Sequence, residues 1–252
     1  MGLARTRAAA ILSRADAGGC SLAGVVLAGA VMFPDLTRDD VFYLETGRLW
    51  LRWPRASDAG AIAAFASLPD VARMTAGIPH PYPPGEAERF ILKSRIGNAE
   101  GSALALVITQ KGGGGPAFGL VSATLSAARE VEIGYILSPA QWGKGYATEA
   151  VKALIGVVFG LTNASRILAN SREVNQASRR VLENCGFAYI DTGLDPLPAR
   201  GGLHPCERFQ LDRKAWASSQ WSRQMPSMMH QIHGESDLAA LVVAASTQDP
   251  GI

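Results

Sequence analysis

The sequence lacks the signals of several large classes of protein. It has no run of lysine and arginine interleaved with aromatic residues, and its formal net charge is only +2, so it does not resemble a nucleic-acid-binding protein. The apolar stretch Cys20–Phe33 has 14 residues, whereas a membrane-spanning helix needs about 20. We therefore expect neither a nucleic acid nor a membrane as partner.

Cysteine is scarce as well. Cys20, Cys185 and Cys206 are odd in number and widely spaced, which fits neither a disulfide framework nor a zinc site. His230 and His233 could face one way on a helix and bind a metal, but they lie in the C-terminal tail. We expect no metal, and a reducing, cytoplasmic environment.

What the chain does contain is enough apolar sequence for one good core. Of its 252 residues 48% are hydrophobic and 18% are charged, and no internal repeat is found. Residues 1–43 are rich in Ala and Gly without a sustained period, and residues 217–252 are rich in Ser, Gln and Met. Three arginines precede the apolar stretch 20–33 and weakly echo a secretory signal, but Asp16 and the length of the leader argue against export. We expect two poorly ordered extensions around one domain, residues 44–216.

Within that domain, strand and helix patterns alternate, which predicts an α+β fold with a mixed, mostly antiparallel sheet flanked by helices. The patterns predict helices over residues 57–67, 86–95, 147–160 and 176–185. They predict strands over residues 49–53, 103–110, 117–125, 131–137, 166–169, 187–190 and 208–211.

The stretch Gly143–Thr148 joins a predicted strand to a predicted helix. The first N–H groups of a helix have no partners and carry partial positive charge, so a glycine-rich entry lets a phosphate approach the backbone. The alternative is an ordinary tight turn. Two familiar phosphate loops do not match: Ser138 stands where a P-loop needs glycine, and Thr148 replaces the last glycine of the dinucleotide fingerprint.

Two segments carry a specific resemblance. The run VEIGYILSPAQWGKGYATEAVKALIGVVF, followed by NQASRRVLENCGF, resembles the GNAT superfamily of acetyl-CoA-dependent N-acetyltransferases. The most similar branch is the ribosomal-protein alanine N-acetyltransferase, or Rim, type. The resemblance covers residues 44–214 and is strongest over 131–187.

This resemblance implies acetyl-CoA as co-substrate and a set of residues that bind it. The pyrophosphate loop falls on residues 142–147, with Trp142 where the family usually has Gln or Arg. The preceding strand would pair through its backbone with the pantetheine arm, and Asn175 would hydrogen-bond that arm near the sulfur, although Asn175 is equally read as a helix N-cap. The implied cofactor-binding residues are Tyr135, Ile136, Leu137, Trp142, Gly143, Lys144, Gly145, Tyr146, Ala147, Thr148 and Asn175.

The implied reaction needs a base and a proton donor. An amine must lose a proton before it attacks a thioester, and Glu132, on a strand face shared with Gly134, is the best candidate base, with Glu130 a weaker substitute. The alternative for Glu132 is a solvated strand residue. A backbone N–H near Leu137 would stabilise the oxyanion. Many members of the superfamily place a tyrosine where this chain has Leu182, so we expect Ser178 to return the proton to the CoA thiolate, unless it only decorates the first turn of the helix.

The acceptor stays open at this point. The resemblance favours a primary amine, either a protein N-terminus or a small molecule such as a polyamine, an aminoglycoside or an amino-acid-like metabolite. The alternative function is a catalytically silent acyl-CoA-binding module that senses or scaffolds. We expect a monomer or homodimer.

Several tempting residues are assigned structural roles. Cys185 at a helix C-terminus is a poor nucleophile, because the dipole disfavours its thiolate. Arg179 and Arg180 are expected on a solvated helix face, with a phosphate contact as the alternative. The core or the wall of a pocket is expected to hold Trp50, Trp53, Phe65 and Met74.

Overall fold

A computed structural model describes residues 43–112, 115–125 and 130–219. The predicted extension up to residue 42 and the tail from residue 220, with Cys20, His230 and His233, lie outside the described residues. In the described part of the chain, no helix has the length and apolar character needed to cross a bilayer.

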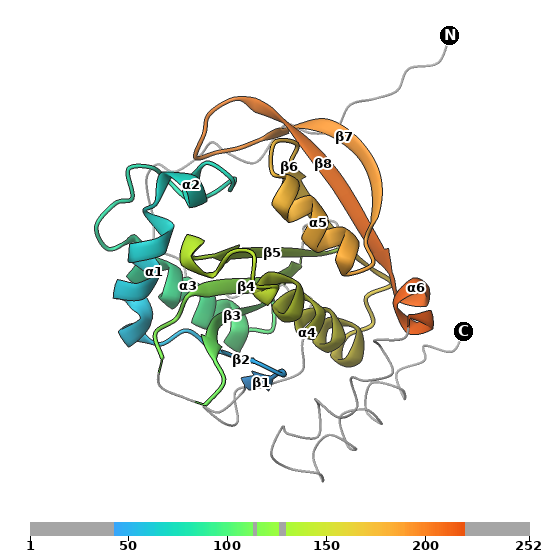
Figure 1. Ribbon diagram of the computed structural model, residues 1–252, viewed down its shortest axis with the longest axis horizontal. Helices are drawn as coiled ribbons and strands as arrows, with labels where there is room; N and C mark the ends of the chain where they lie inside the picture. Colours follow the sequence, from blue (N-terminus) through green and yellow to red (C-terminus); the bar gives the residue numbers. More distant parts are fainter. Residues whose placement is uncertain (1–42, 113–114, 126–129, 220–252) are drawn as a thin grey trace, which may run out of the picture.

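The core of the fold is a single eight-stranded sheet with the order β1-β2-β3-β4-β5-β6-β8-β7 (Figure 1). Neighbouring strands are antiparallel except β5 and β6, which pair in parallel. This is the mixed sheet that the sequence predicted. The strands are β1 (Tyr43–Glu45), β2 (Leu49–Arg52), β3 (Ala103–Gln110), β4 (Gly119–Leu125), β5 (Val131–Leu137), β6 (Arg166–Arg172), β7 (Ala188–Pro196) and β8 (Leu203–Asp212).

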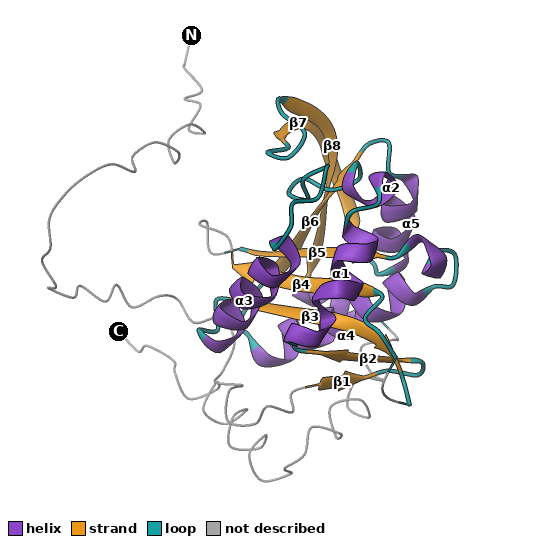
Figure 2. Ribbon diagram, turned by 90° about the vertical axis from the view of Figure 1, so that its left-hand side faces the viewer, coloured by secondary structure: helices purple, strands orange, loops and turns teal. Residues whose placement is uncertain are grey.

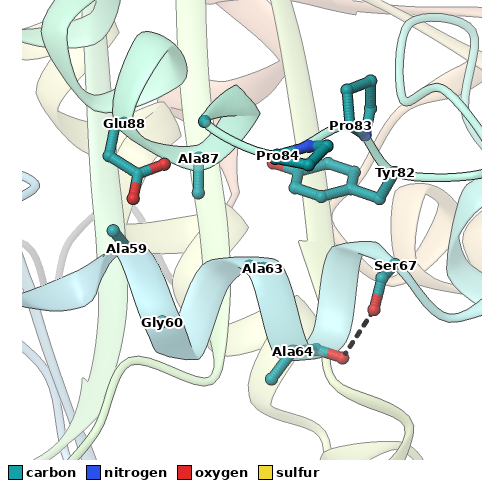
Figure 3. A pocket seen from close by; sticks show the side chains of 11 residues that line it. Ala59, Gly60, Ala63, Ala64, Ser67, Tyr82, Pro83, Pro84, Ala87 and Glu88 are labelled. Carbon is teal, nitrogen blue, oxygen red and sulfur yellow. Dashed lines mark hydrogen bonds between the residues drawn. The ribbon is translucent and has the colours of Figure 1, made fainter.

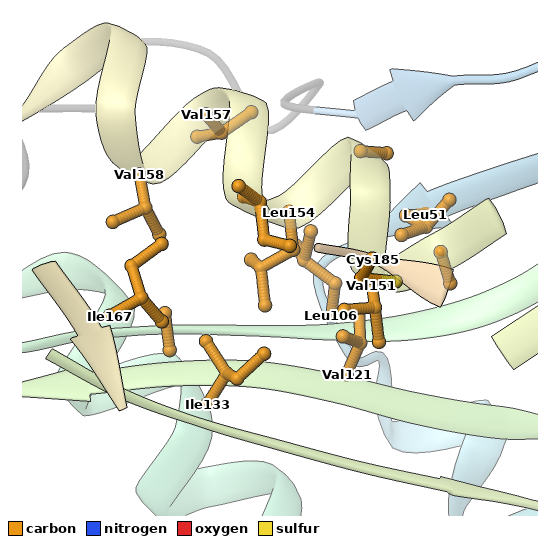
Figure 4. Packing of buried hydrophobic residues seen from close by; sticks show 14 of the residues in the cluster. Leu51, Leu106, Val121, Ile133, Val151, Leu154, Val157, Val158, Ile167 and Cys185 are labelled. Atoms are coloured by element: carbon orange, nitrogen blue, oxygen red, sulfur yellow. The ribbon is translucent and has the colours of Figure 1, made fainter. Parts of the chain in front are cut away.

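Helices cover both faces of the sheet (Figure 2). The helices α4 (Tyr146–Leu161) and α5 (Gln176–Asn184) lie on one face, and α1 (Ala59–Ala66) and α3 (Glu86–Ala99) lie on the other. Figure 4 shows the first of these layers, where Val151, Leu154 and Val158 of α4 descend onto the sheet. Each side chain buried in this way contributes about 1.5–3 kcal/mol, so the helical spacing of these residues identified the core face correctly.

One short strand and two short α-helices were not predicted. These are β1, α2 (Pro69–Ala72) and α6 (Arg213–Ser218), each too short to display a hydrophobic period. Tyr43 pairs with Arg52 in β1–β2, and α6 continues past residue 216, so the structured region extends slightly beyond both predicted boundaries. Trp216 explains the second shift, because its ring packs 5.1 Å from that of Phe159.

The C-terminal hairpin is the largest departure from the predicted lengths. Its two strands were expected to span 187–190 and 208–211, but β7 runs to Pro196 and β8 starts at Leu203. The hairpin arches over the sheet toward the α2 segment (Figure 1). At its tip the N–H of Ala199 donates to the carbonyl of Ala76 over 3.0 Å, and Arg200 donates to the carbonyl of Ile78.

A single arginine closes the C-terminal end of α4. The guanidinium of Arg213 donates to the carbonyl oxygens of Phe159, Thr162 and Ala164 at 2.5, 2.5 and 2.8 Å. The last carbonyls of a helix have no partners within it, and a cation there also complements the helix dipole.

We expect Arg213→Met to lower the free energy of unfolding by about 2 kcal/mol, because three carbonyls lose a charged donor. Urea titration of the two proteins measures this difference. The neighbouring exposed Lys214→Met is the matched control and should change stability by less than about 0.5 kcal/mol. Equal stability of Arg213→Met and Lys214→Met would contradict the capping role.

Candidate active site

The sheet opens between β5 and β6. Their parallel pairing consists of Val131 with Ile167 and Glu132 with Leu168, although β5 continues to Leu137 and β6 to Arg172. The two strands therefore diverge directly after Glu132, and the rest of β5 lacks a strand partner on that side.

The backbone groups along this part of β5 can be oriented from its pairing with β4. The N–H of Ser138 donates to the carbonyl of Phe118 over 2.7 Å, and hydrogen-bonded positions alternate along an antiparallel ladder. The N–H and C=O groups of Leu137, and by the same alternation those of Tyr135, thus point away from β4 toward the opening. An extended ligand could pair with them as an added strand.

A glycine-rich turn leads from the end of β5 into α4. Gly143 and Gly145 adopt φ values of +74° and +78°, and Gly145 is the N-cap of α4 with no side-chain cap. Side chains are disfavoured at such φ values, so glycine leaves the first N–H groups of α4 accessible. The predicted turn thus has the backbone geometry of an anion site.

Trp142 and Lys144 hold this turn in place. The indole N–H of Trp142 donates to the carbonyl of Leu137 over 2.9 Å, while the ring stays 48% exposed. The ammonium of Lys144 donates to the carbonyl of Ala140 and to the side-chain oxygen of Gln141. Trp142 therefore links the turn to the end of β5, a role that the sequence did not suggest.

A charged network that the sequence did not predict supports the glycine-rich turn. The side chain of Glu149, in the first turn of α4, accepts hydrogen bonds from Thr46 Oγ1 at 2.5 Å and from the backbone N–H of Arg48 at 2.9 Å. Arg48 Nε and Nη2 lie 2.7 and 2.6 Å from Glu149 Oε2, and Arg48 Nη1 donates to the carbonyl of Lys144 at 2.9 Å. The guanidinium also lies 4.7 Å from the ring centre of Tyr146.

These bonds fix the charge of Glu149. Burial alone would raise the pKa of its carboxyl, but the hydrogen bonds from Thr46 and Arg48 outweigh burial and hold the pKa below its usual value. In the sequence, the acidic residue just after a glycine-rich helix start is the one signal that points to a nearby cation. The β1–β2 turn that supplies that cation has no pattern of its own.

Glu132 lies at the point where the strands diverge. Asn170 of β6 donates to Glu132 Oε1 over 3.4 Å. Burial raises the pKa of the Glu132 carboxyl, and the negative charge of Asp195 on β7 raises it further. Glu132 is exposed to solvent at the point where the strands diverge, and a carboxylate with a raised pKa there is suited to accept a proton.

The opposite side of the opening is formed by the start of α5. Asn175 caps this helix, since its side-chain oxygen accepts the N–H of Ser178 over 3.1 Å. The hydroxyl of Tyr135 lies 2.8 Å from Ser178 Oγ and 3.0 Å from the Ser178 carbonyl oxygen. The cap reading of Asn175 is thus confirmed, and its NH2 group is the part that could donate to a ligand.

Three other assignments can be compared with the structure. Leu182 and Cys185 are fully buried in the core, and burial raises the pKa of the Cys185 thiol to about 12, which agrees with its structural assignment. The helix face of Arg179 and Arg180 is solvated as expected, because Arg180 is exposed and the Arg179 side chain is 35% exposed. Arg179 binds Glu183 at 2.9 Å and the buried Glu207 of β8 at 2.6 Å. Glu207 lies on β8, which starts at Leu203, before the predicted start of that strand at residue 208.

A separate groove of about 430 Å³ lies between α1 and residues 82–88, in the other helical layer (Figure 3). Small residues of α1 form its floor, and Tyr82, Pro83 and Pro84 lie across from them. None of the predicted site residues lines it. Among residues 43–112, 115–125 and 130–219, no cluster of His, Cys, Asp and Glu could hold a metal ion.

Comparison with known proteins identifies a family that matches this chain. Residues 48–188, more than half of the chain, match the family model described as an acetyltransferase (GNAT) domain. A FsC-acetyl coenzyme A-N(2)-transacetylase of Aspergillus fumigatus is 28% identical over 91 residues, 35% of this chain and 39% of that protein. An uncharacterised N-acetyltransferase p20 of Bacillus licheniformis is 36% identical over 86 residues, 34% of this chain and 48% of that protein. The chain thus spans less than half the length of these curated relatives.

Solved structures share the fold. RimJ of Mycobacterium smegmatis, in complex with a CoA disulfide, aligns with a TM-score of 0.61 and 21% identity over 75% of this chain and 94% of its own. Spermidine N-acetyltransferase of Vibrio cholerae, in complex with CoA and spermine, aligns with a TM-score of 0.57 and 17% identity over 68% of this chain and 98% of its own.

Proposed function

The chain belongs to the GNAT acetyltransferase family, and from that premise we propose that it transfers an acetyl group from acetyl-CoA to the nitrogen of a primary amine. One observation carries the proposal. The sheet opens between β5 and β6 directly after Glu132, a carboxylate with a raised pKa, and the unpaired remainder of β5 leads through the glycine-rich turn into α4. Within the family, the RimJ neighbour supports the Rim-type branch.

The residues present fit acetyl-CoA as co-substrate. The N–H groups at Gly143–Thr148 would hold its pyrophosphate, because both glycines leave that backbone uncovered. The outward-facing backbone of Tyr135 would pair with the pantetheine arm, with Ile136 bound to β4. At Leu137 the carbonyl accepts the Trp142 indole N–H, so its N–H would be left for the thioester end. The remaining proposed contacts are Trp142, Lys144, Tyr146, Ala147 and the NH2 group of Asn175.

The proposed chemistry follows from these positions. Glu132, directly or through water, accepts a proton from the ammonium form of the acceptor, and the neutral nitrogen then attacks the thioester carbonyl. The N–H of Leu137 faces the opening and would stabilise the oxygen that gains negative charge. The N–C bond forms and the C–S bond breaks. The nitrogen loses a second proton, the departing thiolate gains one, and Ser178 is the proposed hydroxyl beside it.

The acceptor is proposed as a protein N-terminus or a small cationic amine. The exposed carboxylate of Glu132 brings negative charge to the opening and favours a cation over an anion, whereas Asp195 beside it is paired with Arg208 at 2.5 Å. We propose a cytoplasmic location, a monomer or homodimer, no metal, and no nucleic-acid or membrane partner. The catalytic domain is proposed to span about residues 44–216, extended by the end of α6.

The test is release of free CoA thiol on mixing the protein with acetyl-CoA and a panel of amines, with the product identified by mass. The panel contains peptides with free N-termini, polyamines, aminoglycosides and amino acids. We expect at least one amine to gain 42 mass units and to release one CoA per acetyl group. Tight acetyl-CoA binding without transfer to any member would favour the alternative, an acyl-CoA sensor or scaffold. The proton-accepting environment of Glu132 makes that alternative the weaker one.

A further prediction concerns the network under the turn. Arg48→Met leaves the carboxylate of Glu149 without its main cation at the start of α4, where negative charge opposes a phosphate. We expect the Kd for acetyl-CoA, measured by calorimetry, to rise about tenfold, and Arg48→Met combined with Glu149→Gln to recover most of that loss. Arg89→Met, which removes a similar exposed pair with Glu86 on α3, is the control and should leave the Kd unchanged. An unaltered Kd in Arg48→Met would contradict the role of the network.

A further inference from the structure

The side chain of Tyr135 has no part in the function proposed so far. Its backbone faces the opening, whereas its ring packs against the core beneath α4 and α5. The hydroxyl at the end of that ring reaches the first turn of α5, where it lies 2.8 Å from Ser178 Oγ and 3.0 Å from the Ser178 carbonyl oxygen. A residue of the strand that would hold the cofactor arm thus contacts the proposed donor to the sulfur.

The protons of this pair can be arranged in two ways. In the first, Tyr135 donates to Ser178 Oγ, and the proton of the serine is free to point elsewhere. In the second, Tyr135 donates to the carbonyl oxygen, which can only accept, and the serine donates back to Tyr135. A thiolate beside Ser178 selects the first arrangement, because a charged acceptor forms the stronger hydrogen bond.

We propose that Tyr135 is a positioning residue that holds the Ser178 hydroxyl as a hydrogen-bond donor to the CoA thiolate. The inference rests on the proposed function and refines the role of Ser178 there. Without the Tyr135 hydroxyl, a serine in the first turn of a helix is drawn to backbone carbonyls nearby. With it, Oγ accepts one hydrogen bond and donates another in line, and each bond strengthens the other.

Together, Tyr135 and Ser178 supply no net proton to the sulfur. Burial raises the pKa of the Tyr135 hydroxyl, so tyrosinate is disfavoured and Tyr135 remains a donor throughout. A serine alkoxide is equally unfavourable. The proton that the sulfur finally gains is balanced by the second proton lost from the acceptor nitrogen, and both hydroxyls end as they began.

A double-mutant cycle tests whether Tyr135 acts through Ser178. With saturating acetyl-CoA, we expect kcat to fall about tenfold in Ser178→Ala and about fivefold in Tyr135→Phe. The double variant should match Ser178→Ala alone, since Tyr135 then has nothing to orient. Tyr189→Phe is the matched control. It removes a hydroxyl that pairs with Thr192 Oγ1 at 2.9 Å on β7, and kcat should stay as in the wild type.

A second measurement follows binding instead of turnover. Free CoA has an ionisable thiol, with an ordinary thiol pKa near 8.5, and acetyl-CoA has none. We expect the wild-type protein to favour CoA over acetyl-CoA increasingly between pH 7 and 9.5, and we expect this pH dependence to be lost in both Tyr135→Phe and Ser178→Ala. A purely structural role of Tyr135 would weaken both ligands alike at every pH.

The possible outcomes distinguish failure of the role inferred for Tyr135 from failure of the proposed acetyltransferase function. If Tyr135→Phe lowers kcat by the same factor with and without Ser178, or if its CoA preference keeps the wild-type pH dependence, the positioning role is overturned. A protein that binds CoA but transfers nothing would contradict the proposed function, and the pH dependence of binding would still decide the role of Tyr135. Absence of CoA binding would overturn both.

Discussion

Gly145→Asp should abolish acetyl-CoA binding, with a rise in Kd of at least about a hundredfold. Gly145 is the N-cap of α4 with φ +78°, and its N–H belongs to the turn that would hold the pyrophosphate. A carboxylate there repels phosphate and offers the first N–H groups of the helix an internal partner, so it competes with the ligand in two ways. Asn and Asp tolerate positive φ better than other side chains, so the fold should persist.

The matched control separates charge from volume. Gly145→Asn adds a side chain of the same shape without the charge, and a Cβ at this position would lie 3.4 Å from Arg48 Nη2. We expect a loss of about tenfold in Gly145→Asn, smaller than in Gly145→Asp. Calorimetry with acetyl-CoA gives the Kd, and thermal melting confirms that both variants fold. Equal affinity of wild type and Gly145→Asp would place the pyrophosphate elsewhere.

Glu132→Gln should lower kcat about a hundredfold at neutral pH, because the substitution keeps the size of the side chain and removes the proton acceptor. Wild-type turnover should rise with pH through the raised pKa of Glu132, since only the ionised carboxylate accepts a proton. In Glu132→Gln that acid limb should vanish. Turnover should then recover in part at alkaline pH, where amines with pKa values near 8 to 10.4 lose their proton unaided.

The stability of this variant provides an internal check. A carboxyl whose pKa is raised by folding stabilises the protein below its ordinary pKa, and that stabilisation is lost as the pH rises through the raised value. Ionised Glu132 thus costs stability at pH 7, and Glu132→Gln should melt no lower than wild type. Glu130→Gln is the control, because Glu130 contacts Arg166 at 3.5 Å and should leave the pH profile unchanged. A wild-type pH profile in Glu132→Gln would assign Glu132 to the solvated strand face.

The sequence was informative where a local pattern coincided with a structural need. The glycines of the turn and the periodic apolar residues of α4 predicted both the helix and its glycine-capped start, because 143–158 is a single local unit. The choice between cap and ligand for Asn175 could not be made from sequence. An N-cap and a ligand contact require the same side chain; the hydrogen bond from Ser178 shows the cap, and the ligand contact of the NH2 group is a proposal.

Other parts of the site depend on contacts between distant segments. The partners Arg48 and Glu149 are 101 residues apart, and each is an ordinary surface residue within its own segment. The length of β7–β8 was underestimated for the same reason. Most side chains of β7 are exposed, so its hydrophobic alternation is weak and its extent is set by pairing with β8. Patterns over short windows do not contain such information.

The hairpin that arches over the sheet also sets the order in which the molecule can be completed during synthesis. The hydrogen bond from Arg200 to the carbonyl of Ile78 joins residues 122 positions apart. The ribosome synthesises the chain from its N-terminus at about 5–20 residues per second. The hairpin tip is therefore made several seconds after the α2 segment that it contacts. β1 to β5, each next to the following strand in the sheet, can pair during that interval. Asp195 of β7, which acts on Glu132, therefore arrives only after the turn at Gly145 and helix α4 have left the ribosome.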